Sequence, residues 1–142
     1  MEYLQWMILP YRRYFDFSGR SRRKEYWMFA LFNILVSIVI DMLFGSATYQ
    51  RTGFYVGFST ELSGTSGMLH NLFGLVSFIP GLAVAVRRLH DQDRSGWLLL
   101  LLFIPILGWF ALLVLMLLDG TRGRNRFGPD PKNPGEEADV FS

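Results

Sequence analysis

The sequence predicts an all-α protein that crosses a membrane more than once. It is 142 residues long, 51% of them hydrophobic, and its mean hydropathy is +0.24. The hydrophobic residues gather in three long runs, and all 14 basic residues lie outside those runs. Because a charge at the centre of a bilayer costs about 2.5–3.5 kcal/mol, this separation is what a membrane imposes on a sequence. The absence of cysteine excludes disulfide scaffolds, thiolate metal sites and cysteine nucleophiles.

The three runs cover residues 26–44, 68–86 and 97–118, which are 19, 19 and 22 residues long. About 20 helical residues cross the roughly 30 Å hydrocarbon core of a bilayer, so each run is long enough to span it. A soluble bundle of buried helices is the alternative. It is disfavoured because residues 97–118 carry almost no polar side chain and would present no face to water. The first run is preceded by 25 residues, which favours a retained anchor over a cleaved signal peptide.

Basic residues near the ends of the runs predict the orientation. Six lie in residues 1–25, and a single one, Arg51, lies in the loop 45–67, so we expect a cytosolic N-terminus and an external loop. The third run leaves two alternatives: one kinked crossing, or a helical hairpin that turns back at Pro105–Gly108. A hairpin places 13 basic residues inside and 1 outside, against 9 and 5 for a single crossing. We therefore favour the hairpin, with a cytosolic tail.

The remaining segments predict one membrane domain over residues 1–131. In residues 1–15, aromatic and apolar side chains recur at helical spacing, which predicts an amphipathic helix at the membrane interface that Pro10 kinks or shortens. Seven of the 24 residues after Leu118 are Gly or Pro. This composition predicts a tail that is largely unstructured beyond its first few residues, with residues 132–142 flexible.

Small and polar residues share one face of each of the first two predicted helices. Asn33 and Ser37 lie one turn apart and Asp41 follows, while Gly74 and Gly81 lie on one face of the second helix. Small residues let helices approach closely, and Asn or Ser supply hydrogen bonds between them, so we interpret all of these except Asp41 as helix-packing residues. The alternative is a polar pathway that ends at Asp41, which would make the protein a small oligomeric transporter or channel subunit.

The densest group of chemically active side chains lies in residues 87–97. One histidine, two carboxylates and three arginines stand within eight residues there. We predict no metal or cofactor site, because the other histidine, His70, lies at the opposite end of the second run. We also predict no catalytic residue, since no nucleophile motif is present, and an enzyme that acts on a phosphorylated lipid through His90 and Asp91 is the less favoured alternative. The plainest interpretation is a cytosolic turn held by ion pairs.

Arginines from two segments are expected to meet at the cytosolic face. Guanidinium groups bind phosphate bidentately, and basic pockets between helices on this side bind anionic lipid headgroups. Glu25 begins the first run, so we expect it to pair with Arg87 or Arg88 at the end of the second. We predict a non-enzymatic module that binds membrane phospholipid or a membrane protein. That protein partner can be a second copy of the same chain. We predict no binding to nucleic acid. The candidate binding residues are Arg20, Arg22, Arg23, Glu25, Arg87, Arg88, His90, Asp91 and Arg94.

Three polar blocks carry a family resemblance. Residues 15–27 resemble the opening block of the domain-of-unknown-function family 805, a family of small bacterial inner-membrane proteins. Residues 87–97 resemble its middle block, and residues 125–131 resemble its closing block. The resemblance implies a multi-pass protein of the bacterial inner membrane and assigns no activity. It also favours the hairpin, because only the hairpin places all three blocks on one face of the membrane.

Overall fold

The computed structural model describes residues 2–44 and 64–133 and is built from helices. Within those residues no strand occurs, which confirms the predicted all-α class. Most of the predicted external loop, residues 45–63, and the end of the tail, residues 134–142, lie outside the described part. The helices are α1 (Tyr3–Arg12), α2 (Arg23–Phe44), α3 (Thr65–Asp91), the 3-10 helix η1 (Gly96–Phe103) and α4 (Leu107–Leu117).

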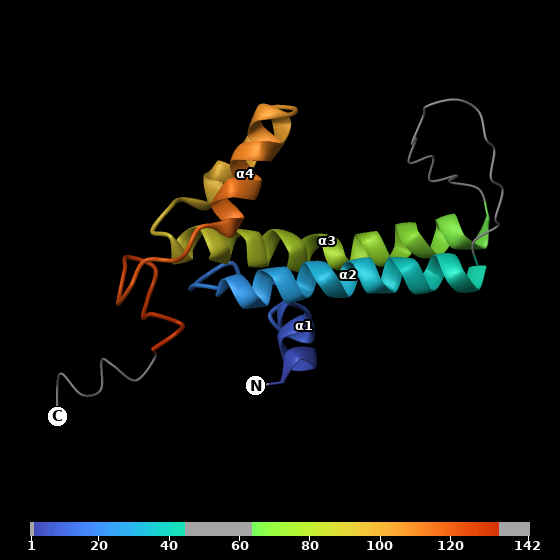
Figure 1. Cartoon of the computed structure of the whole chain (residues 1–142), viewed down its shortest axis with the longest axis horizontal. Coiled ribbons are helices and arrows are strands. Elements are labelled where there is room, and N and C mark those ends of the chain that lie inside the picture. The colour runs from blue at the N-terminus through green and yellow to red at the C-terminus, as the bar shows by residue number, and fades with distance from the viewer. Residues whose placement is uncertain (1, 45–63, 134–142) are drawn as a thin grey trace.

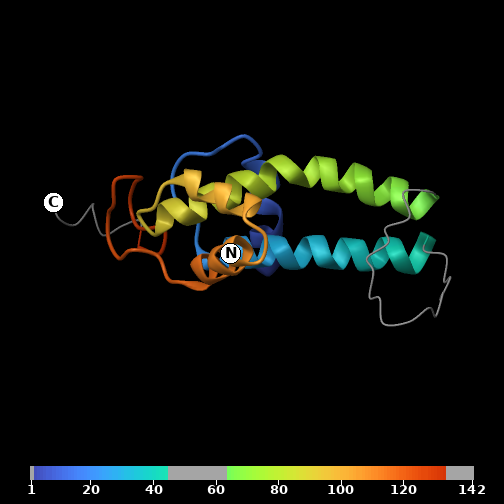
Figure 2. The same ribbon diagram turned by 90° about the horizontal axis from the view of Figure 1, so that it is seen from above.

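Helices α2 and α3 run antiparallel, side by side, along the long axis of the molecule (Figures 1 and 2). They contain the first two predicted runs, and both are long and apolar enough to cross a membrane. Their large apolar side chains face outward: Ile34 is 57% exposed, Met42 80% and Leu75 71%. A helix pair in water would turn such residues inward, so this surface is suited to lipid.

Helix α1 lies crosswise against the α2–α3 pair (Figure 1). The Tyr11 hydroxyl and the Ser77 hydroxyl lie 2.6 Å apart, within hydrogen-bonding distance, and the Tyr11 ring packs on Phe29 with 5.3 Å between centroids. Pro10 lies inside the helix, which continues to Arg12, so Pro10 does not end it. A helix therefore forms where the aromatic spacing predicted one.

The third hydrophobic run turns back on itself. Helix η1 ends at Phe103, the chain reverses, and α4 follows; the Trp109 indole N–H donates to the Leu102 carbonyl across the turn at 2.9 Å. A side chain at Gly108 would overlap the Leu101 carbonyl, so the turn requires glycine there. Of the two alternatives for this run, the hairpin is the one that forms, with a 3-10 helix as its first arm. Among the described helices only α2 and α3 are long enough to cross a membrane.

The hairpin contacts the opposite face of the α2–α3 pair from α1, near the end where α3 finishes (Figure 1). A small apolar core lies at this junction, formed by Ala85, Leu89 and Met116. Next to it, the largest fully buried side chains are charged ones, Arg87 and Arg88. Within the described residues, charged side chains are therefore buried as completely as the apolar core at this end of the molecule.

Residues 119–133, which we call the C-terminal strap, return to this same end of the molecule. They contain no helix, yet they are held by hydrogen bonds to α3 and to Arg20. The prediction of a largely unstructured tail was wrong for these residues. Gly and Pro excluded a helix, but they did not prevent the polar side chains between them from fixing the chain.

Candidate functional site

The last turn of α3 is the centre of a buried ionic cluster. Successive residues of a helix project about 100° apart, so the neighbours Arg87 and Arg88 point in different directions, whereas Arg88 and Asp91, three residues apart, lie on one face. Both arginine side chains are 0% exposed and the Asp91 side chain is 3% exposed. Buried charges of this kind persist only when each finds partners, and here three surrounding segments supply them.

Arg87 joins α3 to the segment that precedes α2. Its Nη2 lies 2.9 Å from Glu25 Oε1, and its Nε donates to the Ser21 hydroxyl at 2.8 Å. Its Nη1 donates to the carbonyl of Asp16. Of the two partners expected for Glu25, the structure therefore selects Arg87, and the ion pair is confirmed. Arg88 points the other way, and its guanidinium donates to the carbonyl of Leu118 at the end of α4.

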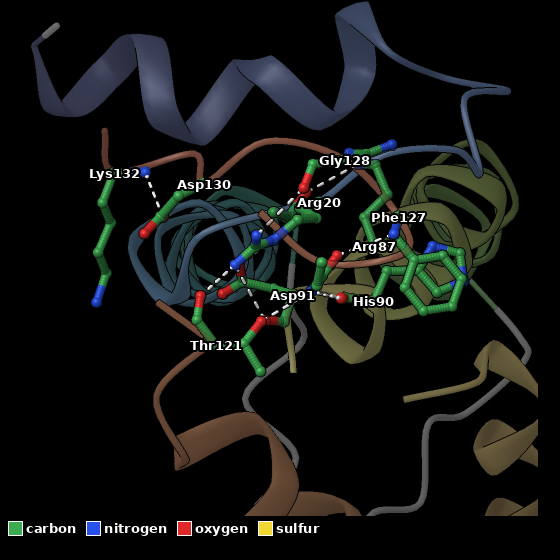
Figure 3. Close-up of polar contacts among 12 residues, drawn as sticks. Arg20, Arg87, His90, Asp91, Thr121, Phe127, Gly128, Asp130 and Lys132 are labelled. Atoms are coloured by element: carbon green, nitrogen blue, oxygen red, sulfur yellow. Dashed lines mark hydrogen bonds and ion pairs between the residues drawn. The ribbon is translucent and has the colours of Figure 1, made fainter. Parts of the chain in front are cut away.

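Asp91 is shared by two arginines. Its Oδ1 accepts from Arg20 Nε at 3.0 Å, and its Oδ2 accepts from Arg88 Nη1 at 2.7 Å. Arg20 extends the connection to the strap, because its Nη1 donates to the Gly123 carbonyl at 2.6 Å and its Nη2 to the Thr121 carbonyl (Figure 3). A single guanidinium thus links the chain before α2, the end of α3 and the C-terminal strap.

The strap is fixed at two further points. The Asn125 amide donates to the His90 carbonyl at 2.9 Å, and the Phe127 ring stacks on the His90 ring with centroids 3.9 Å apart and planes within 4° (Figure 3). Asp130 closes the strap on itself by accepting from the Gly123 N–H at 3.0 Å. Sequence reasoning did not name Thr121, Asn125 or Asp130 as site residues. The resemblance of residues 125–131 to a family block was a signal for Asn125 and Asp130, and Thr121 lies outside that block.

The nine predicted binding residues divide into two groups. Five are buried in the ionic cluster: Arg20, Glu25, Arg87, Arg88 and Asp91. The other four lie around it. Arg22 stacks over Trp6 at 5.5 Å, and Arg23 Nη1 donates to the Leu117 carbonyl at 3.1 Å. His90 is half-buried, and the exposed guanidinium of Arg94 makes no hydrogen bond or ion pair within the described residues.

Charge is distributed differently between the buried cluster and its rim. The segments 2–25, 87–95 and 119–133 carry thirteen basic and seven acidic side chains. Three of each are buried, so the interior is balanced. The rim therefore keeps ten basic side chains against four acidic ones, and this end of the molecule presents a positive surface.

Carboxylates around the cluster are stabilised in their charged form. The hydroxyl of Ser18, together with Arg13, lowers the pKa of Asp16 to about 2. Burial raises the pKa of Asp130, but the backbone N–H groups of Lys132 and Gly123 outweigh it and leave the pKa lowered. The exposed Asp119 also has a lowered pKa, chiefly through its hydrogen bond from the Lys132 ammonium. These groups are therefore ionised at neutral pH.

The residues interpreted as helix-packing occupy different surroundings. A Cβ at Gly81 would meet the Phe29 ring at 3.6 Å, whereas one at Gly74 would have nothing within 4 Å. Ser37 is half-buried, and the Asn33 amide donates to the Phe29 carbonyl of its own helix at 2.9 Å. Farther along α2, Asp41 lies 3.7 Å from His70, and no third metal-ligating side chain within the described residues joins them.

The cluster unites the three blocks on which the family resemblance rests, and the family model described as "Protein of unknown function (DUF805)" matches residues 14–129. The chain belongs to the DUF805 family. The chain is 43% identical to the Inner membrane protein YhaH of Escherichia coli K12, over 91% of this chain and 98% of that protein. It is also 43% identical to the Inner membrane protein YhaI of the same strain, over 91% and 97% of the two chains.

A more distant relative is the Uncharacterized protein YiiR of Escherichia coli K12, 28% identical over 88% of this chain and 92% of that protein. No solved structure is significantly similar to the chain. The YhaH and YhaI matches extend over nearly the whole length of those proteins. This DUF805 chain is therefore similar to them as whole proteins.

Proposed function

We propose that this DUF805 protein is a multi-pass protein of the bacterial inner membrane in which α2 and α3 cross the bilayer. The names of its two relatives support the location, and the outward-facing apolar side chains of both helices support the crossing. Both helices exceed the roughly 20 residues that a crossing needs, at 22 and 27 residues.

The buried cluster supports the placement of three segments on one side of this membrane. Arg20 precedes α2, Asp91 ends α3, and the strap follows α4, and hydrogen bonds tie all three together. The thirteen basic residues of these segments are then on one side, against Arg51 alone in the connection between α2 and α3. By the positive-inside rule, the side with the cluster is cytosolic, and both termini are in the cytosol.

Helix α1 and the hairpin are then interfacial. Both lie crosswise to α2 and α3 near the end that carries the cluster (Figure 1), so they run along the membrane surface. The hairpin exposes Trp97, Phe103 and Ile106 at 78%, 83% and 79%. It therefore inserts into the cytosolic leaflet, where one apolar side faces acyl chains and its polar ends stay with the cluster.

We assign this cytosolic face the role of a non-enzymatic module that binds anionic phospholipid headgroups. The observation that carries this proposal is the contrast between a charge-balanced interior and a rim of ten basic and four acidic side chains. An enzyme based on His90 and Asp91 is disfavoured, because both carboxylate oxygens of Asp91 are already held by arginines. The rim arginines, such as Arg94 and Arg122, are the groups that remain for lipid.

The orientation is tested by fusing a reporter that fluoresces only in the cytosol to Ser142. We expect a fluorescent, membrane-inserted fusion. A stably inserted but dark fusion would overturn the cytosolic placement of the strap, and with it the proposal that the basic rim faces the cytosolic leaflet.

Headgroup binding is tested by native mass spectrometry after detergent exchange with equal amounts of phosphatidylglycerol and phosphatidylcholine. We expect preferential retention of phosphatidylglycerol, and we expect a variant with Arg22→Gln, Arg94→Gln and Arg122→Gln to lose that preference while it keeps its fold. Asp93→Asn is the matched control, because it alters an exposed charge on the same rim in the opposite direction and should keep the preference. Equal retention of both lipids by the unmodified protein would overturn the proposal.

A further inference from the structure

An apolar pocket of about 350 Å³ lies where the hairpin meets the α2–α3 pair. Four elements line it: Tyr26 comes from α2, Ala85 from α3, Leu99 and Leu102 from η1, and Trp109, Leu113 and Met116 from α4. The volume is within the range of about 300–1,000 Å³ that small-molecule sites occupy. Because Leu113 and Trp109 remain 48% and 55% exposed, the pocket opens to the outside of the bundle.

In the proposed orientation this opening faces the acyl chains of the cytosolic leaflet. The hairpin prevents the pocket from being an ordinary lipid-facing groove, because η1 and α4 form one wall crosswise to α2 and α3 (Figure 1). A chain held there touches protein on several sides. In a bilayer such packing contacts, and not the hydrophobic effect, distinguish a bound chain from bulk lipid.

A basic group stands at the polar rim of the same pocket. Arg23 lies one helical turn before Tyr26, a lining residue, and its Nη1 donates to the carbonyl of Leu117, the neighbour of the lining residue Met116. Its Nε is 3.5 Å from Asp119 Oδ1, which also accepts from Lys132 at 2.5 Å. Two cations thus share one carboxylate, and the rim keeps one positive charge. The Arg23 side chain is 46% exposed and can be reached from outside.

We infer that this pocket is a specific phospholipid site that holds one acyl chain of an anionic phospholipid while Arg23 binds its phosphate. The charge of the rim matches a single phosphodiester anion, and a guanidinium can bind two phosphate oxygens at once. This inference rests on the proposed function and deepens it, because it assigns one lipid a fixed position among the many that touch the surface.

The test uses the full chain in vesicles of phosphatidylglycerol and phosphatidylcholine, with one of the two carrying a photoreactive diazirine on its acyl chain. We expect the phosphatidylglycerol probe to label Leu99, Leu102 and Met116. Leu113→Trp should fill the pocket and lower that labelling about tenfold, a change equivalent to about 1.4 kcal/mol. Leu75→Trp is the matched control, because Leu75 is 71% exposed on α3 and does not line the pocket. It should leave the labelling unchanged.

The outcomes separate this inference from the proposed function. If neither Leu113→Trp nor Leu75→Trp changed the labelling, the pocket would not be the lipid site. A retained preference for phosphatidylglycerol would in that case still support headgroup binding by the basic rim. Equal labelling by both probes would overturn the role of Arg23, and so would an Arg23→Gln variant with unchanged selectivity. A smaller oligomer in the Leu113→Trp variant would overturn the inference by assigning the pocket to a second copy of the chain.

Discussion

The two ends of the α2–α3 pair place their ionisable side chains in different surroundings. At one end, Glu25 and Asp91 are buried with three arginines, and two of the three ion pairs, Arg20–Asp91 and Arg87–Glu25, join segments far apart in the chain. At the other end, Asp41 Oδ1 lies 3.7 Å from His70 Nε2, and the Asp41 side chain is 65% exposed. The first arrangement determines the fold, whereas the second is an ordinary contact at the ends of two helices.

The comparison shows that the number of arginines at one end of this protein does not reveal what each arginine does. Arg20, Arg87 and Arg88 are buried, and carboxylates and carbonyl groups of the chain itself bind all three guanidinium groups, although Arg88 Nε has no hydrogen-bond partner among the described residues. Arg94 and Arg122 are exposed. Neutralising a member of the first group should damage the fold, and neutralising the second should change what the surface binds.

The largest effect is expected from Asp91→Asn. The substitution leaves Arg20 and Arg88 buried beside a neutral amide, and breaking a buried ionic group costs about 3–5 kcal/mol. We expect a large fall in the thermal unfolding midpoint in detergent, together with protease cleavage within the strap. Asp93→Asn is the control, because Asp93 is exposed and pairs with Arg126 at 3.2 Å, so its loss should cost at most about 1 kcal/mol. Similar losses in both variants would contradict the buried cluster as the stabilising element.

Gly120→Ala should give the next largest effect. A Cβ at residue 120 would overlap the Asp91 carboxylate, so the strap or the cluster must shift, at a cost of about 1–3 kcal/mol. The same substitution at Gly74 is the matched control. It meets nothing within 4 Å on a helix and should stabilise by up to about 1 kcal/mol. The unfolding midpoints of the two variants should therefore move in opposite directions, and a neutral Gly120→Ala would show that the strap is not closely packed on Asp91.

Sequence patterns predicted what depends on hydropathy and on the distribution of charge along the chain. The two long helices, the hairpin at Pro105–Gly108 and the pair between Glu25 and an arginine of α3 all follow from hydropathy, charge counts and position along the chain. The fixed conformation of the strap did not follow from these patterns. Its Gly and Pro content indicated an irregular chain, and irregular backbone reveals nothing about which side chains fix it.

The site shows the same limit. Charge counts brought Arg20, Arg87 and Arg88 to one end of the molecule, but they could not separate buried arginines from exposed ones, since both kinds look alike in sequence. Burial here depends on long-range contacts, such as Arg20 with the carbonyls of residues 121 and 123, which lie about a hundred positions away. Backbone carbonyls carry no sequence signal, so this part required the structure.

Lowering the pH is expected to have a smaller effect on the stability of the fold. The pKa of Asp16 is lowered to about 2 in the folded protein, so its charged form contributes stability above the unfolded pKa near 3.8 that is lost as pH falls toward 2. The effect is modest because the carboxylate is 36% exposed. Unfolding midpoints measured from pH 5 to pH 2 should fall more steeply for the unmodified protein than for Asp16→Asn. Ser18→Ala should remove part of the difference, because the Ser18 hydroxyl is the main cause of the shift; parallel curves for all three would contradict it.

The smallest effect is expected at the far end of α2. Asp41→Asn removes an exposed carboxylate from a histidine 3.7 Å away, and exposed pairs of this kind contribute at most about 1 kcal/mol. Glu25→Gln, near the other end of the same helix, removes a carboxylate that is 3% exposed and 2.9 Å from Arg87, which should cost about 3–5 kcal/mol. These two variants therefore compare the two ends of the α2–α3 pair within the single helix α2. If Asp41→Asn instead abolished ion flux in proteoliposomes without a change in stability, the far end would be functional, and the transporter alternative would replace the lipid-binding module.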